Sequence, residues 1–383
     1  MTEHSSILTF AAFRLLFFAI WSSPLIGQAA PAADGTACGC MFASVAGNTS
    51  VKLRGTTNSV RATPHMVVHF GDLLLVGGAD TSLVCDGGND TVVLTQGPHA
   101  VPCSVGGGKP ILIGGRAQNA RLLDDSTLGA GGAADFPLLL APRATRILDS
   151  HPTLRWQCIP NVTVYNLNVR GAGLSWAATA TSTAMLKYPN DAPELKRSQP
   201  YKLVITAGGR SSEEEDQPGL GFTLLSSEDE RRVNAAEAEI DGMTVGTPTK
   251  LILKSHLLAN NGLIAEAIDL LQEPPHSCDV SVAPDSATTD PDTLQLLGTL
   301  YARIGLTRRA EEYLLAALQS SVTSGDKLGE AVSSDYLGQI YVALGNKTNA
   351  LTKLQQAERA YEAIGDHDKI TDVQHRIHAL QGP

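Results

Sequence analysis

The chain has few aromatic residues and no concentration of positive charge. Aromatic residues make up 5% of its 383 residues, and the formal net charge is −10. A nucleic-acid-binding surface needs a basic stripe, so the composition argues against a nucleic-acid partner. Hydrophobic residues nevertheless reach 43%, which predicts folded modules. A chain of this length is expected to form two or three of them.

Motifs of the common enzyme classes are missing. The sequence contains neither the Gly-x-Ser-x-Gly of hydrolases nor the His-Glu-x-x-His of zinc peptidases. The stretch Gly106–Lys109 is glycine-rich like a phosphate-binding loop, but Pro110 stands where that loop needs Ser or Thr. We therefore expect no catalytic residues and no cofactor. An enzyme with an unfamiliar site is the alternative.

Patterns that could bind a metal are weak. His65 and His69 lie in a strand-like run, where residues four apart are too distant to share one ion. His375 and His378 have a spacing that suits a helix, but no Cys or carboxylate cluster accompanies them. The acidic run at 211–216 lacks the spaced Asp pattern of a calcium loop. We interpret that run as a solvated loop and expect no metal.

An apolar stretch near the N-terminus predicts export. Residues 15–26 are mostly apolar, follow Arg14, and precede the Ala-x-Ala sequence Ala30–Ala32. This order is typical of a signal peptide, so residues 1–32 are expected to direct the chain to the periplasm or the cell surface. An uncleaved anchor is the alternative, and membrane contact is expected only in that case. Nothing later in the sequence is apolar for long enough to span a membrane.

Six cysteines are expected to enter an oxidising compartment after export, where disulfides persist. Cys85 and Cys103 flank one hairpin-like stretch, and we predict that they form a disulfide. The spacing of Cys38 and Cys40 is too tight for the usual Cys-x2-Cys zinc knuckle, and no second pair accompanies them.

Residues 41–116 predict a small β-roll or sandwich. Short β-rich runs at 66–70, 73–76, 82–84 and 91–94 are separated by turn signals at 77–78, 86–90 and 96–98. The succession of Gly71–Leu75, Gly78–Ala79 and Val84–Gly87 resembles the periplasmic domain of iron-citrate-regulator (FecR-like) proteins. That resemblance offers an alternative function, an envelope signal sensor. Only 14 residues precede the apolar stretch, whereas regulators of that family carry a cytoplasmic segment there.

A second β-module is expected at 137–225, after a Gly- and Ala-rich linker at 117–136. Alternation places Leu154 and Trp156 on one strand face, and Tyr165 and Leu167 on one face of the next strand. The buried Trp on an early strand, followed by a Tyr, resembles a fibronectin type III or immunoglobulin-like sandwich. Such modules are usually spacers or binding surfaces, so the resemblance assigns no chemistry.

From residue 226 to 383 the periodicity becomes helical. The segments 297–317 and 337–357 share identical offsets, with Leu-Gly, then Tyr, then Gly, then an Ala–Leu–Ala set. This resembles the tetratricopeptide repeat (TPR) and implies a short α-solenoid. An earlier copy with Leu258 and Gly262 is degenerate, because Lys254 and Ser255 replace its Leu-Gly pair.

Glycines give these repeats their expected geometry. Gly298 and Gly338 should let the paired helix approach closely, and Gly305 and Gly345 should end the first helices in left-handed caps. Polar inserts between the copies lengthen their spacing to 43 and 40 residues. One apolar stripe in the tail predicts a closing helix, and its members are Ile370, Val373, Ile377 and Leu380.

The repeat resemblance also indicates a binding surface. In TPR proteins the first helices line a concave face, and the matching positions are Gln295 and Thr299 in one copy, and Asp335 and Gln339 in the next. These side chains suit an extended peptide, although a merely solvated surface is equally compatible. We expect an exported, non-catalytic adaptor whose β-modules space or display the array and whose partner is a protein or peptide. The sequence specifies neither that partner nor the oligomeric state.

Overall fold

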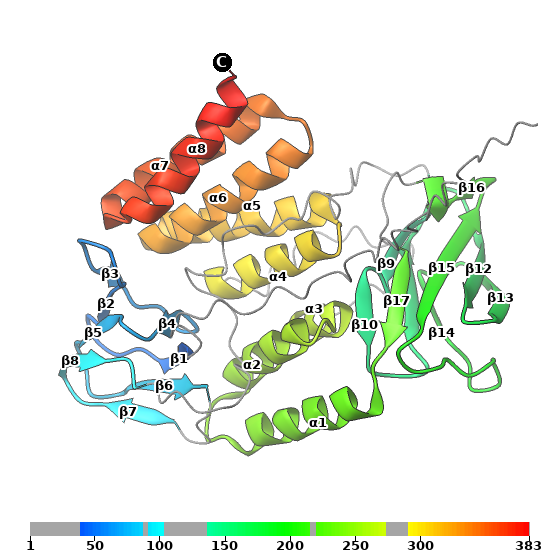
Figure 1. Ribbon diagram of the computed structural model, residues 1–383, viewed down its shortest axis with the longest axis horizontal. Helices are drawn as coiled ribbons and strands as arrows, with labels where there is room; N and C mark the ends of the chain where they lie inside the picture. Colours follow the sequence, from blue (N-terminus) through cyan, green and yellow to red (C-terminus); the bar gives the residue numbers. More distant parts are fainter. Residues whose placement is uncertain (1–38, 87–90, 103–135, 215–219, 273–289, 383) are drawn as a thin grey trace, which may run out of the picture. The chain divides into compact units, whose positions relative to one another are not determined.

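Antiparallel β-sheets form the N-terminal half of the chain and stacked helices form the C-terminal part, as the sequence predicts (Figure 1). The structure is a computed structural model that describes residues 39–86, 91–102, 136–214, 220–272 and 290–382. These residues all belong to one compact unit, Gly35–Pro383. The predicted signal peptide and most of the predicted linker lie outside the described residues.

The first β-module consists of two four-stranded sheets with the orders β4-β1-β6-β7 and β3-β2-β5-β8. The predicted short strands are present, although Gly97, expected in a turn, begins a strand. The strands are β1 (Gly39–Ser44), β2 (Ser50–Lys52), β3 (Val60–Arg61), β4 (Val67–His69), β5 (Leu73–Val76), β6 (Thr81–Cys85), β7 (Val92–Leu94) and β8 (Gly97–Ala100). We call residues 39–102 the N-terminal β-module.

The predicted Cys85–Cys103 disulfide is wrong, because Cys85 is bonded to Cys40. Strands β1 and β6 pair antiparallel with Cys40 directly opposite Cys85, and these two residues form a disulfide with a Cα–Cα distance of 3.9 Å. Strand pairing decides the bond, because residues opposite each other in a ladder are close enough to be bridged. Cys103 lies outside the described residues.

The second β-module, residues 138–224, is a sandwich of two sheets. One sheet has the order β10-β17-β15-β12-β13, with β16 beside β15, and the other has the order β14-β11-β9. Its elements are β9 (Leu138–Ala141), β10 (Thr145–Ile147), β11 (Thr153–Gln157), β12 (Val164–Gly171), β13 (Leu174–Thr181), β14 (Met185–Lys187), β15 (Pro200–Ala207), β16 (Arg210–Ser211), the 3-10 helix η1 (Ser212–Glu214) and β17 (Gly221–Leu224).

The core of the sandwich forms around the two aromatic residues that the sequence singled out. Trp156 and Tyr165 are fully buried, and their ring centroids are 5.5 Å apart. The Tyr165 hydroxyl accepts a hydrogen bond from the Ile159 backbone N–H at 2.9 Å. A buried tyrosine needs such a partner for its polar end. The predicted alternation is confirmed on β12, where Tyr165 and Leu167 are buried between more exposed residues. On β11, Leu154 and Trp156 are buried, but so is Arg155 between them.

Two glutamates of the acidic run, Glu213 and Glu214, form surface ion pairs, while Glu215 and Asp216 lie outside the described residues. Glu213 pairs with Lys202 at 2.7 Å and with Arg170 at 2.9 Å. These cations hold the pKa of Glu213 below its usual range, the Lys202 hydrogen bond contributing most. Exposed pairs of this kind contribute little to stability.

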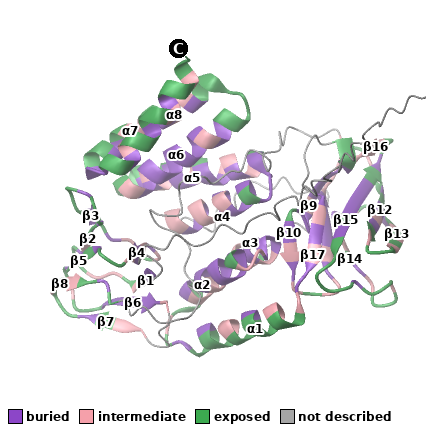
Figure 2. Cartoon of the chain, in the orientation of Figure 1, coloured by how far each residue is buried: buried purple, intermediate pink, exposed green. Residues whose placement is uncertain are grey.

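Eight helices follow in the described residues. They are α1 (Ser227–Gly242), α2 (Thr247–Asn260), α3 (Ile264–Leu271), α4 (Pro291–Arg303), α5 (Thr307–Ser324), α6 (Lys327–Ala343), α7 (Lys347–Ile364) and α8 (His367–Gln381). Ser226 caps α1, accepting a hydrogen bond from the Asp229 N–H, which is the usual role of serine at this position. We call α1–α8 the helical array. Figure 2 shows that burial is heavier on α2 and α6 than on the largely exposed α8.

The predicted roles of the repeat glycines are confirmed. A Cβ on Gly298 would lie 2.6 Å from Leu314 Cγ, and a Cβ on Gly338 would lie 2.6 Å from Leu354 Cδ2. Only glycine therefore allows α4 to contact α5, and α6 to contact α7, at this separation. Gly305 and Gly345 have φ values of 75° and 68°, the left-handed region that favours glycine after a helix.

The degenerate first copy keeps close packing by another route. Ser255 stands at the glycine position, is fully buried, and donates a hydrogen bond from Oγ to the Ala267 carbonyl at 3.0 Å. Its hydroxyl is thus satisfied between α2 and α3. The predicted closing helix is present as α8, and Val373 and Ile377 are its buried apolar residues.

The N-terminal β-module packs against the helical array. Phe42 and Leu74 share one buried cluster with Tyr361 and Ile364 of α7, and the Asn58 backbone N–H donates to the Ile364 carbonyl at 3.1 Å. Burial of apolar surface is the main stabilising term for such contacts. The N-terminal β-module therefore shares a buried core with the array.

Candidate functional site

The four residues predicted to contact a partner lie on two first helices of the repeats. Gln295 and Thr299 are on α4, and Asp335 and Gln339 are on α6. Gln295, Thr299 and Gln339 are half-buried, whereas Asp335 is only 2% exposed. The Thr299 hydroxyl donates to the Leu296 carbonyl at 2.8 Å. The structure thus leaves three of the four partly accessible.

Asp335 is held by an arginine from α8. Arg376 binds both carboxylate oxygens of Asp335, with 3.0 Å between Nη2 and Oδ2. Gln339 Nε2 donates to Asp335 Oδ1 at 3.2 Å. A buried carboxylate with this many donors is already satisfied, so Asp335 orders the surface rather than offering a free contact. We define the α4/α6 surface as Gln295, Thr299 and Gln339.

The same face is covered in the first repeat copy. Ile252 stands 43 residues before Gln295, the offset between these copies, and is 5% exposed. It belongs to a buried cluster with Met41 and Val84 of the N-terminal β-module. That module therefore covers this position on α2, and the predicted binding face is confined to α4 and α6.

Polar side chains also join the N-terminal β-module to the array. His65 Nδ1 lies 3.4 Å from Asp290 Oδ2, and its Nε2 lies 3.4 Å from the Thr249 hydroxyl. Thr63 donates from Oγ1 to Asp292 Oδ2 at 3.0 Å. Sequence reasoning considered His65 only as a metal ligand. Its acidic neighbour is 225 residues away in the chain, so no local pattern could have identified this contact.

Burial sets the protonation of this junction. Burial, with the nearby carboxylates of Asp290 and Asp326, raises the pKa of Asp292 well above its usual value. Burial also opposes ionisation of Asp290, but hydrogen bonds from His65 and Thr293 outweigh it and lower that pKa. On α2, burial lowers the pKa of His256 to about 4, and the neighbouring Arg303 and His65 act in the same direction. Neutral His256 is therefore the form that this interior accepts.

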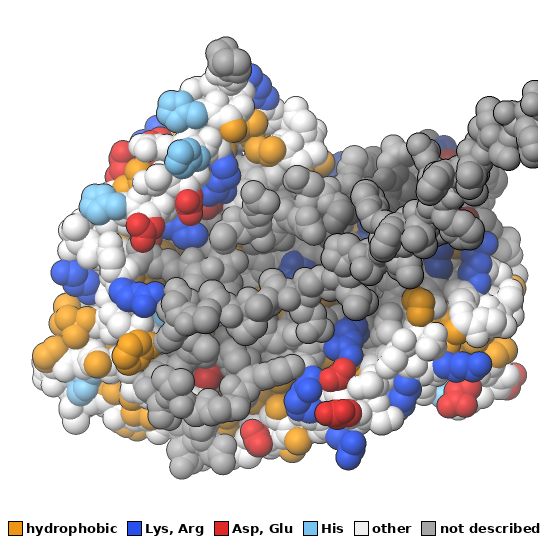
Figure 3. Space-filling view, in the orientation of Figure 1, with side chains coloured by type: hydrophobic (Ala, Val, Ile, Leu, Met, Phe, Trp, Pro, Cys, Tyr) orange, Lys and Arg blue, Asp and Glu red, His pale blue; other side chains and the backbone are white. Residues whose placement is uncertain are grey.

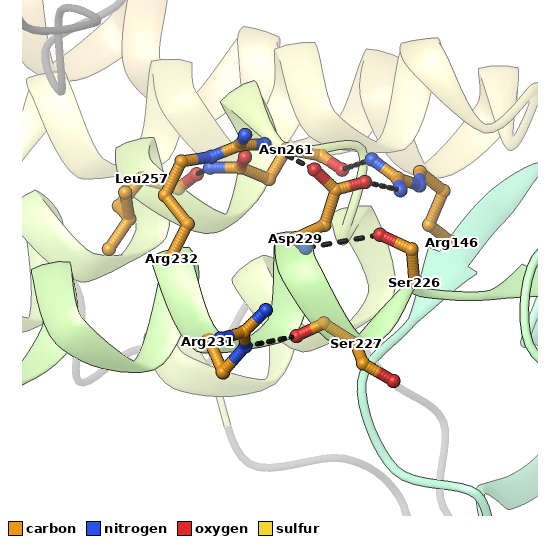
Figure 4. A network of polar contacts seen from close by, with 8 residues as sticks. All are labelled: Arg146, Ser226, Ser227, Asp229, Arg231, Arg232, Leu257 and Asn261. Atoms are coloured by element: carbon orange, nitrogen blue, oxygen red, sulfur yellow. Dashed lines mark hydrogen bonds and ion pairs between the residues drawn. The ribbon is translucent and has the colours of Figure 1, made fainter.

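The sandwich is joined to the array through the turn between α2 and α3 (Figure 4). The Arg146 backbone N–H donates to the Gly262 carbonyl at 2.8 Å. Its guanidinium donates to Asp229 at 2.5 Å and to the Asn261 carbonyl at 3.2 Å. Arg232 contributes a second cation beside Asp229, and the Arg146 hydrogen bond is the largest cause of the lowered pKa of Asp229.

A buried carboxyl supports the same junction. Glu266 Oε1 accepts a hydrogen bond from the Leu148 N–H at 3.1 Å, while its Oε2 is buried without a hydrogen-bond partner. Burial raises the pKa of Glu266 to about 7 against the opposing effect of the Leu148 hydrogen bond. A shifted carboxyl is a candidate for chemistry only where a cavity and partner groups accompany it.

The nearest cavity is too small for a substrate. It has a volume of about 30 Å³ and lies between β9, β11 and α3–α5. Arg155 crosses it to bind Asp269 at 2.6 Å, and Gln272 bonds the hydroxyls of both Tyr301 and Tyr313. A space of this size accommodates about one water molecule. These groups pair with one another, so the arrangement is a structural network.

A more open groove of about 430 Å³ lies beside β10 and β17. Its lining includes Arg146, already paired with Asp229, and Arg303, which donates to the Ala259 carbonyl at 2.9 Å. No His, Cys, Asp or Glu is among the described residues that line it. The groove thus offers two cations but no acid–base pair.

Metal and membrane sites are not found in the described part of the chain. No group of three His, Cys, Asp or Glu side chains there could hold a metal ion; the pair His375 and His378 lies on α8. None of the described helices is long and apolar enough to cross a membrane. Figure 3 shows acidic and basic side chains intermixed over α7 and α8, while hydrophobic side chains gather over the N-terminal β-module.

Comparisons with known proteins give no family. No family model matches the chain, and no curated protein matches it. A solved structure of a polysaccharide lyase aligns at 10% identity with a TM-score of 0.17, over 90% of this chain and 58% of that one. The chain thus spans little more than half the length of that protein, and the match carries no argument about fold or function.

Proposed function

We propose that this protein is an exported, non-catalytic adaptor that binds a protein segment through its TPR-like hairpins. The observation that carries the proposal is the α4/α6 surface. Thr299 and Gln339 stand at corresponding positions of two helical hairpins, and Gln295 lies one turn before Thr299 on α4. The Asp335–Arg376 pair connects α6 to α8. Amide and hydroxyl groups in such a row suit the backbone of an extended peptide.

Export through the predicted signal peptide, to the periplasm or cell surface, is part of this proposal. The Cys40–Cys85 disulfide supports it, because such bonds persist in oxidising compartments and are rare in the cytosol of mesophiles. Neither the FecR-like nor the fibronectin type III-like resemblance implies a catalytic role for the two β-modules. Their proposed role is to hold and cover the array.

The covered face limits the size of the partner. Because Ile252 of α2 packs with Met41 and Val84, a bound segment would have to lie along α4 and α6 alone. A short groove of this kind suits one peptide segment or one contact in an assembly. Long superhelical arrays instead wrap extended partners along many repeats.

Site-specific photo-crosslinking in the native host tests the proposal. A photoreactive residue at Thr299, the third member of the α4/α6 surface, should yield one discrete adduct with a partner protein. The variant Q295K/Q339K should reduce that adduct at least about tenfold, since lysine lacks the amide oxygen that would accept a hydrogen bond from a bound peptide. Circular dichroism should show unchanged helix content.

A matched control keeps the test specific. Thr352 is exposed on α7, so T352K adds charge to the array away from the α4/α6 surface and should leave the adduct unchanged. Equal adduct yield from Q295K/Q339K and the unsubstituted protein would remove this surface from consideration.

A sensor is the second candidate. The observation that favours it is the His65–Asp290 and Thr63–Asp292 contacts, which connect the FecR-like module to the array. A signal that displaced the module would uncover α2. N-terminal sequencing of the mature protein separates the two functions, because a membrane-anchored regulator would retain residues 1–32.

A further inference from the structure

Strand β13 forms the longest strand edge that the described residues leave open. It pairs along all eight of its residues with β12, from Leu174 opposite Gly171 to Thr181 opposite Val164. No other described strand pairs with it, and it is the last strand of its sheet in Figure 1. Its outer side therefore presents backbone N–H and C=O groups without strand partners.

The other described strand edges are short, interrupted or covered. Strands β3, β4, β7, β9 and β14 have two to four residues each. Strand β8 contains Pro98, which lacks a backbone N–H. The outer side of β10 is bonded to the α2–α3 turn, where Arg146 N–H donates to Gly262. Natural sheets protect their edges by these devices, and β13 uses none of them.

The chemistry of β13 favours pairing with another strand. The segment 174–181 contains no charged residue and no proline. Ser175, Ala177 and Thr179 are exposed on the outer face. On the inner face Trp176 is only half-buried, with its ring 4.7 Å from that of Tyr188. An added strand would cover more of this aromatic edge and extend the ladder.

We propose that a second copy of this chain occupies the edge, by antiparallel pairing of β13 with β13. A two-fold axis perpendicular to the sheet keeps the inner faces of both copies on the same side. Two residues that lie opposite each other then both have even numbers or both have odd numbers. In the register centred on Ala177, Trp176 lies opposite Ala178. In the register centred on Ala178, Trp176 lies opposite Ala180. Either register sets the large ring against a small side chain.

Charge on the strand does not oppose pairing of two copies. Every cross-strand pair in both registers is uncharged, so identical strands meet without like-charge contact. A two-fold pairing closes on itself and yields a dimer, not a fibre. The net charge of −10 acts between the bodies of the two copies, so added salt should strengthen the dimer by screening it.

Analytical ultracentrifugation of the full mature chain tests the proposal. The protein should show a concentration-dependent monomer–dimer equilibrium. A177K/T179K sets Lys opposite Lys in either register and should raise the dissociation constant at least about tenfold, as edge lysines do in natural sheets. V164K/T206K places the same added charge on the interior strands β12 and β15 and should leave the equilibrium unchanged.

Cysteine crosslinking adds a second readout. A177C or A178C lies opposite itself in one of the two registers and should give a covalent dimer on mild oxidation. S175C faces Thr179 or Thr181 instead and should not. A monomer at every attainable concentration, or a dimer unaffected by A177K/T179K, would overturn the proposal. If a strand of another protein occupies the edge instead, the purified chain would stay a monomer at every concentration. The adduct at Thr299 is measured separately, so failure of one proposal leaves the other standing.

Discussion

Asp335 and Arg376 form a two-point ion pair between α6 and α8, with the Asp335 side chain 3% exposed. The two residues are 41 positions apart in the sequence. The pair connects the last complete hairpin to the closing helix beneath the α4/α6 surface. A helix near the C-terminus thus orders the proposed α4/α6 surface without contributing a residue to it.

Removing the arginine should destabilise the array. In R376A the buried carboxylate of Asp335 would lose its cation, and such losses cost about 3–5 kcal/mol. The free energy of unfolding from urea titration measures the effect. The control R359A removes an exposed arginine of α7 and should change stability by less than about 0.5 kcal/mol. Equal effects of the two substitutions would contradict the role assigned to the pair.

The repeat glycines should not tolerate alanine. G298A would place a Cβ 2.6 Å from Leu314 Cγ, and overpacking of this kind costs about 1–3 kcal/mol. The matched control is G242A at the end of α1, where a Cβ would have no neighbour within 4 Å. There the loss of unfolded-state entropy should give about 0.4–1 kcal/mol of stabilisation. Thermal unfolding of both variants checks the contrast, and G298A/L314A should recover part of the loss.

Glu266 should make the protein less stable at alkaline pH. Its folded pKa of about 7 lies above the usual 4.5 of a glutamate, so the neutral carboxyl stabilises the fold fully below pH 4.5. That contribution is lost as pH rises through about 7, and a shift of this size corresponds to roughly 3 kcal/mol. E266Q should therefore flatten stability against pH between 4.5 and 7. An unchanged slope in E266Q would exclude this carboxyl as the cause.

His256 should act in the opposite direction. Its folded pKa of about 4 lies below the usual 6.5, so stability is complete above pH 6.5 and falls as pH drops toward 4. The expected loss is again roughly 3 kcal/mol. H256Q removes the titrating group. The free energy of unfolding from chemical denaturation should then fall less steeply between pH 6.5 and 4. Between pH 4.5 and 6.5 the two groups oppose each other, so the double variant E266Q/H256Q is needed to reveal both.

The Cys40–Cys85 bond should be found by peptide mapping of the unreduced protein. The expected crosslinked peptide joins β1 to β6, and a Cys85–Cys103 peptide would contradict it. C40S/C85S opens a loop of 45 residues and should cost about 2–4 kcal/mol, chiefly through the unfolded state. Urea titration of oxidised protein measures that loss.

Much of the fold could be predicted because it depends on local signals. Identical offsets placed Gly298 and Gly338 against the following helices, and alternation placed Trp156 in the core. Both are properties of neighbouring residues along one element. The surroundings of Asp335 were predicted less well. Repeat periodicity alone predicts that Asp335 is exposed. Only its contact with the distant Arg376 shows that its carboxylate is paired and buried.

By itself, the sequence determined the order of modules, the strand and helix runs, and the helix-ending glycines, since periodicity and backbone freedom act within a few residues. The tertiary structure decided which cysteine Cys85 pairs with, because strand register brings Cys40 opposite it. It also decided that the N-terminal β-module covers α2, because Met41 and Ile252, which are far apart in the sequence, share one buried apolar cluster. Contacts between residues this far apart depend on how the modules pack, which local sequence patterns do not encode.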